Sequence, residues 1–509
     1  MRTLVFFTLL LVVGLYCFRD YGLSWDEITQ RQLGTVTLNY ITGKDKGLLN
    51  SKDRSYGQLF ETCLIGVEKM MGFSNQDTQK IFYMRHLVTF FLFYISVVFF
   101  FFFCREAFHD SSLALLGCLM LVIFPRIFAH AFINSKDIPF LSFMIISSWS
   151  AIRFIEKPSL FNAVVHSFCS ALAIDSRISI SCVFIIGITA FLYVSRIVVL
   201  SDRRAMKTTA LLVFYVICTV SLSVLMWPSL WENPLGNFIS YFGRALNFDW
   251  SGSVLYMGQW LFPVRHQVPW HYLPVWIGIT VPLVFLFLFF TGSTYGIYQT
   301  ILHFKEAIKR PYLILSLMWF FIPIVILAVL KSNLCNGWRH VFFVYPALVI
   351  LAVEGYRFLA QGQWWRRIVV TTLVYGQIAV LIVTMVKLHP YEHFYLNELT
   401  GSRHEEALKK FQLDLWLVEF RPALEYILKT DRRPHIKVYL SESDGRLEVE
   451  ILPANQHQRF IFVHNPREAD YNIFDFYRWH DQKDLSIFGK KVYSLIIDQT
   501  EVLFVYKKV

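Results

Sequence analysis

The stretch His86–Cys104, HLVTFFLFYISVVFFFFFC, carries no charged side chain after the histidine that begins it. As an α-helix it is long enough to cross roughly 30 Å of hydrocarbon. Apolar runs of similar length recur along the chain. They predict an α-helical membrane protein and argue against a soluble domain.

The composition of the whole chain agrees with this interpretation. Of its 509 residues, 55% are hydrophobic and only 17% are charged, whereas soluble domains carry about 25% charged residues. About eleven runs are candidate spans, at roughly residues 3–18, 86–104, 112–129, 138–155, 161–175, 179–199, 208–227, 272–291, 312–330, 340–356 and 368–388. We therefore predict a polytopic protein that has the lipid bilayer as its solvent.

Lysine and arginine in the loops predict the orientation of these spans. They gather on one side, at Arg105, Lys157, Arg196, Arg203, Arg204, Lys207, Lys305, Lys309, Arg310, Arg357, Arg366 and Arg367. Because cytoplasmic loops are enriched in such residues, we expect the N-terminus inside and the C-terminal tail outside, in a plasma or inner membrane if the source is bacterial. The same loops explain the net charge of +11, so no nucleic-acid partner is indicated.

The first apolar run has two interpretations, a retained span and a cleaved signal peptide. Gly14-Leu-Tyr-Cys17 is a poor cleavage site, which favours the retained span, and both interpretations place residues 19–85 outside. Apolar residues at helical spacing in Leu59–Met71 predict amphipathic helices along the membrane surface. The eight cysteines form no CxxC pattern, so the spacing predicts neither a zinc framework nor a disulfide-rich domain.

The composition changes after Leu388, which divides the chain into a transmembrane module, residues 1–388, and a tail, residues 389–509. A helical pattern near 404–429 precedes β-like segments at 435–440, 459–463 and 492–497. These predict a small α+β domain outside the membrane.

The outer ends of the spans carry a concentration of acidic and basic side chains. Charges at a membrane are costly and are functional candidates by default. The segments are DYGLSWDEI (20–28), PRIFAH (125–130), NSKD (134–137), Asp175 with Arg177, WPSLWENP (227–234), PWHY (269–272), NGWRH (336–340) and HPYE (389–392). Because all lie on one face, the spans of one bundle can bring them into one cavity.

Several of these residues also have a structural interpretation. Glu27 and Asp137 stand where a helix N-terminus favours an acid. Arg339 and His340 are candidates for anchors that reach the headgroups, and Trp270 for the aromatic belt. Scattered anchors do not explain why isolated acids and several basic residues share one side.

Sugar transfer from a polyprenyl-phosphate donor requires this combination of groups. A carboxylate base deprotonates the acceptor hydroxyl. Arginine, lysine and histidine stabilise the charge that develops on the leaving phosphate. A site at the outer surface suits a sugar whose lipid tail stays in the bilayer.

The chain resembles the integral-membrane glycosyltransferases of the GT-C class. The branch is that of protein O-mannosyltransferases and lipid A aminoarabinose transferases, closest to bacterial phospholipid-carrier-dependent "family 39" transferases. The segments that carry the resemblance are DYGLSWDE (20–27), PRIFAHAFINSKDIPF (125–140), LWENP (230–234), VPWHYLPVWI (268–277), GWRHVFF (337–343), HPYEHFYLNEL (389–399) and FQLDLW (411–416). They occur in the family's order over most of the chain.

The resemblance implies roles for individual residues. Asp26 matches the catalytic base in the first outer loop, Glu27 beside it orients or tunes it, and Asp137 matches the second acid. Implied donor-phosphate ligands are Lys136, Arg177, Arg339 and His340, with His271 and His389 behind them. The resemblance also implies inversion at the anomeric carbon and an outer domain that helps select the acceptor. No cofactor is certain, and a divalent metal is left open because the sequence has no firm ligand motif.

Two other functions remain as alternatives, a transporter or flippase of a lipid-phosphate and a membrane-anchored binding protein. Transporters usually place charge near the bilayer midplane and often show inverted repeats. Neither is visible in this sequence, which favours the enzyme. The identities of the sugar and of the acceptor, whether protein, lipid or cell-envelope glycan, cannot be read from it.

Overall fold

A computed structural model describes residues 1–177, 180–201, 203–246, 252–263, 268–401, 404–413, 416–479 and 485–508. Three parts of the sequence named above lie outside these ranges: Asp414 and Leu415 of the FQLDLW segment, parts of the stretch between the predicted spans 208–227 and 272–291, and the first residue of the predicted span 179–199.

Apolar helices make up most of the described chain. Seven are long and apolar enough to cross a membrane, and the pair α6–α7, bent by 68°, passes the same test together. Shorter apolar helices account for the remaining predicted spans. The prediction of a multi-pass integral membrane protein is confirmed, with seven helices in the described residues that meet the length and hydropathy test, or eight spans if the bent pair is one.

The bundle helices are α1 (Arg2–Cys17), α5 (Thr78–Phe108), α6 (Ser111–Val122), α7 (Pro125–Ile133), α8 (Asp137–Glu156), α9 (Leu160–Ser176), α10 (Ile180–Leu200), α12 (Thr209–Met226), α14 (Tyr272–Thr280), α15 (Leu283–Leu302), α17 (Pro311–Val329), α18 (Tyr345–Ala360) and α19 (Trp364–Leu388). Short elements connect them: α11 (Arg203–Lys207), η1 (Pro228–Leu230), α13 (Pro234–Leu246), β1 (Val254–Tyr256), β2 (Gln259–Leu261), α16 (Phe304–Ala307) and η2 (Arg339–Val344).

The bend between α6 and α7 has a local cause. Pro125 begins α7, and the residue before a proline avoids the helical region. Phe124 is accordingly extended, with φ −74° and ψ 107°. The predicted single span 112–129 is therefore two helices.

Residues 19–85 form α2 (Trp25–Ile41), α3 (Gly47–Asn50) and α4 (Leu59–Met70) before α5 begins. The sequence predicted amphipathic helices here, and α4 buries Leu64 and Ile65. It also buries two acids, Glu61 and Glu68. This helix therefore docks on the protein through charged as well as apolar side chains.

The tail contains the predicted α+β domain. Its helical elements are η3 (Glu392–Phe394), η4 (Glu398–Thr400), α20 (His404–Leu408), α21 (Phe420–Thr430), η5 (Ser443–Ile451), α22 (Ala454–His457), η6 (Pro466–Glu468), α23 (Phe476–Trp479) and η7 (Ser486–Phe488). Its strands are β3 (Ile436–Leu440), β4 (Phe460–Val463), β5 (Tyr471–Asp475), β6 (Lys490–Ile497) and β7 (Thr500–Lys507), in the order β4-β3-β5-β7-β6. The pairs β3–β4 and β3–β5 are parallel, and β7 is antiparallel to β5 and β6.

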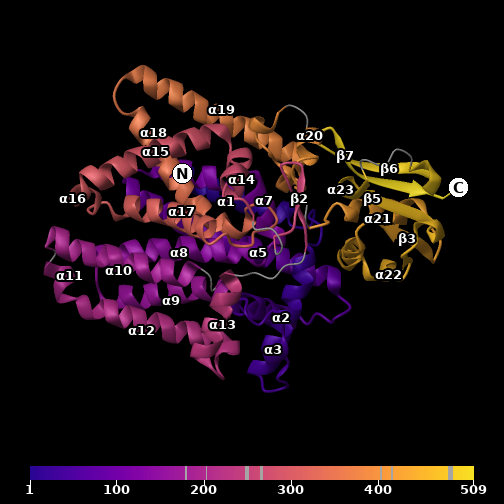
Figure 1. The fold of residues 1–509 in the computed structure, drawn as a ribbon, viewed down its shortest axis with the longest axis horizontal. Coiled ribbons are helices and arrows are strands. Elements are labelled where there is room, and N and C mark those ends of the chain that lie inside the picture. The colour runs from indigo at the N-terminus through magenta and orange to yellow at the C-terminus, as the bar shows by residue number, and fades with distance from the viewer. Residues whose placement is uncertain are drawn as a thin grey trace.

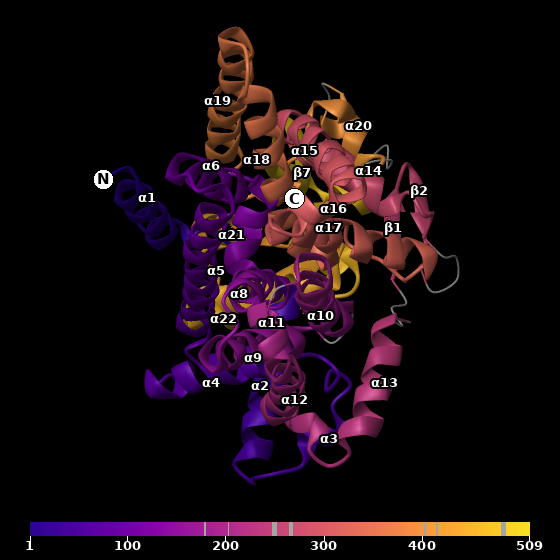
Figure 2. The ribbon, with the colours of Figure 1, turned by 90° about the vertical axis from the view of Figure 1, so that its left-hand side faces the viewer.

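The long helices run roughly along one direction, and the sheet domain lies at one end of the bundle (Figure 1). The short elements α11 and α16 lie at the opposite end (Figure 1). The view from that end shows α8 surrounded by other helices and α19 on the outside (Figure 2). Most of α8 and α18 is buried, whereas α12 and α19 expose most of their residues.

Candidate active site

Asp26 lies in the first turn of α2 because the local sequence forms a capping box. Ser24 is the N-cap, and its backbone N–H donates to Oε2 of Glu27 at 3.0 Å. This pattern fixes where the helix begins. It leaves Asp26 partly exposed, with its Oδ2 accepting a hydrogen bond from Nη1 of Arg339 at 3.2 Å.

The C-terminal domain holds the residues that precede this helix. Arg421 donates through Nη1 to the carbonyl oxygens of Arg19 (2.9 Å) and Tyr21 (2.7 Å). The backbone N–H of Leu23 donates to the buried carboxylate of Glu448 at 2.9 Å. The segment that leads to Asp26 is thus clamped between the bundle and the sheet domain.

Asp137 is the first residue of α8 and is buried. Its Oδ2 accepts hydrogen bonds from Nη1 of Arg339 (3.1 Å) and from the amide of Asn134 (3.0 Å). Its Oδ1 lies 3.0 Å from Nη2 of Arg177, which follows α9. One nitrogen of Arg339 therefore bridges Asp26 and Asp137.

A tight turn brings Arg339 to this position. Asn336 and Gly337, the third and second residues before it, both have positive φ, at 61° and 66°, a conformation that glycine adopts without steric cost. The guanidinium of Arg339 lies over the ring of Trp416 at 4.4 Å. Its Nε is buried and makes no hydrogen bond within the described residues.

Lys136 and His340 lie next to these charges. The ammonium of Lys136 lies 3.7 Å from the ring centre of Tyr56. Arg177 donates to the backbone oxygen of His340 at 2.8 Å, and the ring of His340 lies 3.9 Å from the thiol of Cys335. A small pocket beside Lys136 is lined by Gln30, Tyr56, Gly57, Phe60, Glu61, Ser135, Lys136, Pro139, Asp175 and Ser176.

Asp175 has a different role from that of its neighbour Arg177. Its carboxylate accepts from the backbone N–H of Leu59 at 3.2 Å, which satisfies a free donor at the start of α4. This acid anchors the start of α4 to the end of α9.

Two predicted site residues lie in other clusters. The Nε2 atom of His389 lies 3.0 Å from Oδ2 of Asp20, and its Nδ1 atom lies 2.9 Å from Oε1 of Glu392. Burial alone lowers the pKa of His389, but the two carboxylates outweigh burial and raise this pKa to about 9. His271 pairs through Nδ1 with the hydroxyl of Tyr256 at 2.6 Å.

Glu27 points away from Arg339 into a buried charge network. Its carboxylate lies 3.2 Å from Nε2 of His86. Behind it, Arg85 pairs with Glu61 and lies 3.5 Å from Glu68. Burial is the main cause that raises the pKa of Glu61.

This network also reaches the turn before Asp137. Ser135 donates to Oε1 of Glu61 at 2.6 Å, two residues before Asp137. The network therefore supports the turn that carries the second acid.

Sequence reasoning did not select Asn134 and Trp416 as site residues. Asn134 fixes the turn before α8, because its Oδ1 accepts from the backbone N–H of Asp137 at 2.8 Å. Its place in the NSKD segment was a usable signal. Trp416 belongs to the predicted FQLDLW segment, but no spacing rule relates it to Arg339.

The carboxylate pair suits a guanidinium better than a divalent cation. Arg339 and Arg177 already neutralise Asp137, and a magnesium or calcium ion prefers oxygen ligands that are free to coordinate it. The positive charge between the acids is thus supplied by the chain itself.

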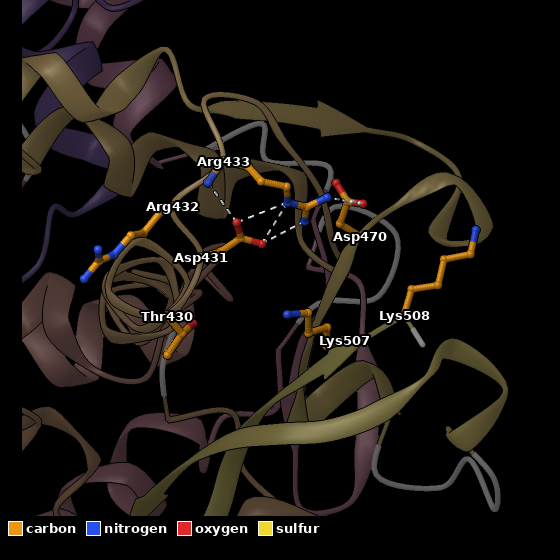
Figure 3. Close-up of a pocket in the computed structure, with 7 residues that line it drawn as sticks. All are labelled: Thr430, Asp431, Arg432, Arg433, Asp470, Lys507 and Lys508. Carbon is orange, nitrogen blue, oxygen red and sulfur yellow. Dashed lines mark hydrogen bonds and ion pairs between the residues drawn. The ribbon is translucent and has the colours of Figure 1, made fainter.

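A second polar pocket lies on the sheet domain. Figure 3 shows Arg433 between Asp431 and Asp470, with Lys507, Lys508 and Arg432 around them. Arg433 lowers the pKa of Asp431 to about 2. The pocket lining carries more positive than negative side chains.

Comparison with known proteins places this geometry in a known structural class. Residues 80–227 match the family model described as dolichyl-phosphate-mannose-protein mannosyltransferase. The crystal structure of ArnT from Cupriavidus metallidurans in the apo state matches with a TM-score of 0.50 and 12% identity, covering 99% of this chain and 98% of that one. The same protein bound to undecaprenyl phosphate matches with a TM-score of 0.50 and 13% identity over 99% and 98% of the two chains.

The chain has the fold of the GT-C membrane glycosyltransferases. The family match and this fold together indicate a glycosyltransferase. The search of curated proteins found no match. The narrower "family 39" assignment stays a prediction.

Proposed function

We propose that this chain transfers a sugar from a polyprenyl-phosphate donor to an acceptor on the extracytoplasmic face, with inversion. The observation that carries the proposal is the bridge from Asp26 through Arg339 to Asp137. Three segments far apart in sequence meet there, at the end of a bundle that shares the ArnT fold. One ArnT structure was solved with undecaprenyl phosphate bound, which supports a lipid-phosphate donor here.

Asp26 acts as the base in this proposal because it is the partly exposed acid of the pair. Its Oδ1 accepts the proton of the acceptor hydroxyl. The hydroxyl oxygen attacks the anomeric carbon from the side opposite the phosphate. The bond from that carbon to the phosphate oxygen breaks, and the carrier phosphate leaves with the electron pair.

Arg339, Arg177, Lys136 and His340 hold the leaving phosphate in this proposal. The buried Nε of Arg339 makes no hydrogen bond within the described part of the chain, so it is available to a phosphate oxygen. Asp137 is the positioning acid, since it binds both guanidiniums. Charge-assisted bonds of this kind stabilise a phosphate more strongly than neutral ones.

Glu27 keeps the orienting role that the resemblance implied, whereas His271 and His389 do not keep theirs. We propose that Glu27 orients Asp26 through the capping box, since its own carboxylate faces His86. His271 and His389 lie in separate clusters, so we do not assign them to the phosphate.

The two ends of the bundle support the proposed orientation. The short helices α11 and α16, which carry predicted cytoplasmic cations, lie at the end opposite the sheet domain (Figure 1). The positive-inside rule then places the sheet domain and Asp26 outside. The positively charged pocket of Figure 3 makes the outer domain a candidate for recognising an acceptor with anionic groups.

Purified protein incubated with polyprenyl-phosphate sugars and candidate acceptors tests the function. We expect free carrier phosphate to appear together with glycosylated acceptor. In proteoliposomes, passage of an intact labelled sugar-lipid across the bilayer without cleavage would contradict the transferase and support a flippase.

A further inference from the structure

Three potential metal ligands meet where the first and last bundle helices end. Cys17 is the last residue of α1, Asp20 lies in the turn after it, and His389 directly follows α19. Their ligand atoms all lie within 4.8 Å of one another. The turn itself is closed by a hydrogen bond from the backbone N–H of Asp20 to the carbonyl of Cys17 at 2.9 Å.

The orientation of the imidazole favours a metal on its Nε2. Nδ1 of His389 lies 2.9 Å from the buried carboxylate of Glu392, which also accepts from the hydroxyl of Tyr21 at 3.1 Å. A carboxylate at Nδ1 fixes the proton there and leaves the Nε2 lone pair for a metal, the usual arrangement of metal-bound histidines. Glu392 and Tyr21 thus provide the outer support that such a site needs.

Nε2 of His389 lies 3.0 Å from the Oδ2 of Asp20, a separation that suits either a shared proton or a shared metal ion. Ligand atoms on one tetrahedral zinc ion stand roughly 3.4 Å apart. The thiol of Cys17 adds nothing to a shared proton, but it completes a sulfur, nitrogen and oxygen ligand set.

We propose that Cys17, Asp20 and His389 bind a zinc ion that joins the ends of α1 and α19. Sulfur and imidazole ligands select zinc over magnesium or calcium. The fourth position is open to water. The ion ties down the base of the segment that leads to Asp26, at a site separate from the Arg339 cluster, and it is independent of the proposed reaction.

Metal analysis of the purified full-length protein tests this proposal without any activity measurement. After chelation, exposure to zinc and removal of excess, we expect about one zinc ion per chain with these three ligands. Zinc should raise the Tm of the chelated wild type, because a ligand that binds only the folded state stabilises it. Absence of both effects would overturn the proposal.

Variants locate the ion. Cys17→Ser and His389→Gln should lose most of the bound zinc and the Tm response, whereas Cys63→Ser, which removes an exposed thiol elsewhere, should keep both. Cobalt substitution should give a thiolate charge-transfer band in the wild type and in Cys63→Ser but not in Cys17→Ser. Asp20 is a proposed ligand in an exposed turn, so Asp20→Asn should fold even if a substitution at Cys17 or His389 does not. It should also lose most of the bound zinc. Zinc content unchanged in Cys17→Ser would contradict the assignment.

Discussion

Arg339 is the side chain on which the geometry of the candidate site depends. It bridges one partly exposed and one buried acid and stacks on Trp416. Arginine suits this place because its planar fork serves several acceptors at once. Lysine would keep the charge but would lose one of the contacts.

Two substitutions of Arg339 distinguish its contribution to stability from its contribution to activity. Arg339→Met leaves Asp137 with only one cationic partner, and loss of one member of a buried pair costs about 3–5 kcal/mol. We expect Arg339→Met to lower the Tm clearly in detergent. Arg339→Lys should lose activity but should lower the Tm less. Lys69→Met, at an exposed position of α4, is the matched control and should change stability by under about 0.5 kcal/mol. An unchanged Tm in Arg339→Met would contradict the structural role.

At this scale the sequence located the residues but not their distances. Asp26, Asp137, Arg177 and Arg339 meet because hydropathy places all of them at span ends on one face. His389 and His271 share that face and yet lie in other clusters. The end of a bundle is wider than one site. Hydropathy predicts at which end of a span a residue lies, but not which residues are neighbours across that end.

At the scale of the elements, α15 and α18 pack closely against each other through two glycines. A Cβ on Gly292 would overlap the carbonyl oxygen of Leu351, and one on Gly355 would overlap that of Leu288. Small residues at such contacts let membrane helices pack through their backbones. This contact positions α18, which begins directly after the segment that carries Arg339.

Gly292→Ala should therefore force the two helices apart. We expect a loss of about 1–3 kcal/mol, the usual cost of overpacking, measured as a lower Tm. Gly376→Ala on α19 is the matched control, because its Cβ would meet open space and alanine favours helices by up to about 1 kcal/mol. Equal Tm values for the two variants would refute the close contact.

The sequence predicted the elements well where one physical signal dominates. Apolar runs located most of the spans, although the predicted span 272–291 covers α14 and only the first part of α15, with Pro282 between the two helices. The predicted β-like segments 435–440, 459–463 and 492–497 correspond to β3, β4 and β6. Sequence reasoning missed β5, in which every residue is buried, because a strand without alternation resembles any short apolar run. It also missed the α6–α7 bend, although Pro125 was a usable signal.

For the whole molecule, the sheet domain and the bundle form one unit around the segment before Asp26. Arg421 and Glu448 bind the backbone of residues 19–23, although about 400 residues of sequence separate the two segments. The sheet domain therefore positions the proposed base in addition to any contact with the acceptor.

Arg421→Ala tests this coupling. Release of the segment should misplace Asp26 and lower turnover by about 10–100-fold, since small misplacements of catalytic groups have large effects on rate. Donor binding should change little. Lys429→Ala, at an exposed position of the same helix α21 and outside the pocket of Figure 3, is the control and should retain wild-type turnover. Wild-type turnover in Arg421→Ala would show that the clamp is dispensable.

The central claim is that Asp26 is the base of a sugar transfer from a lipid-phosphate donor. The most direct measurement is release of carrier phosphate by purified Asp26→Asn and wild-type protein, with donor binding measured in parallel. We expect intact folding and donor binding in the variant, with turnover reduced by about 10²–10⁴-fold, the contribution of a general base. Carrier phosphate released by Asp26→Asn at the wild-type rate would contradict it.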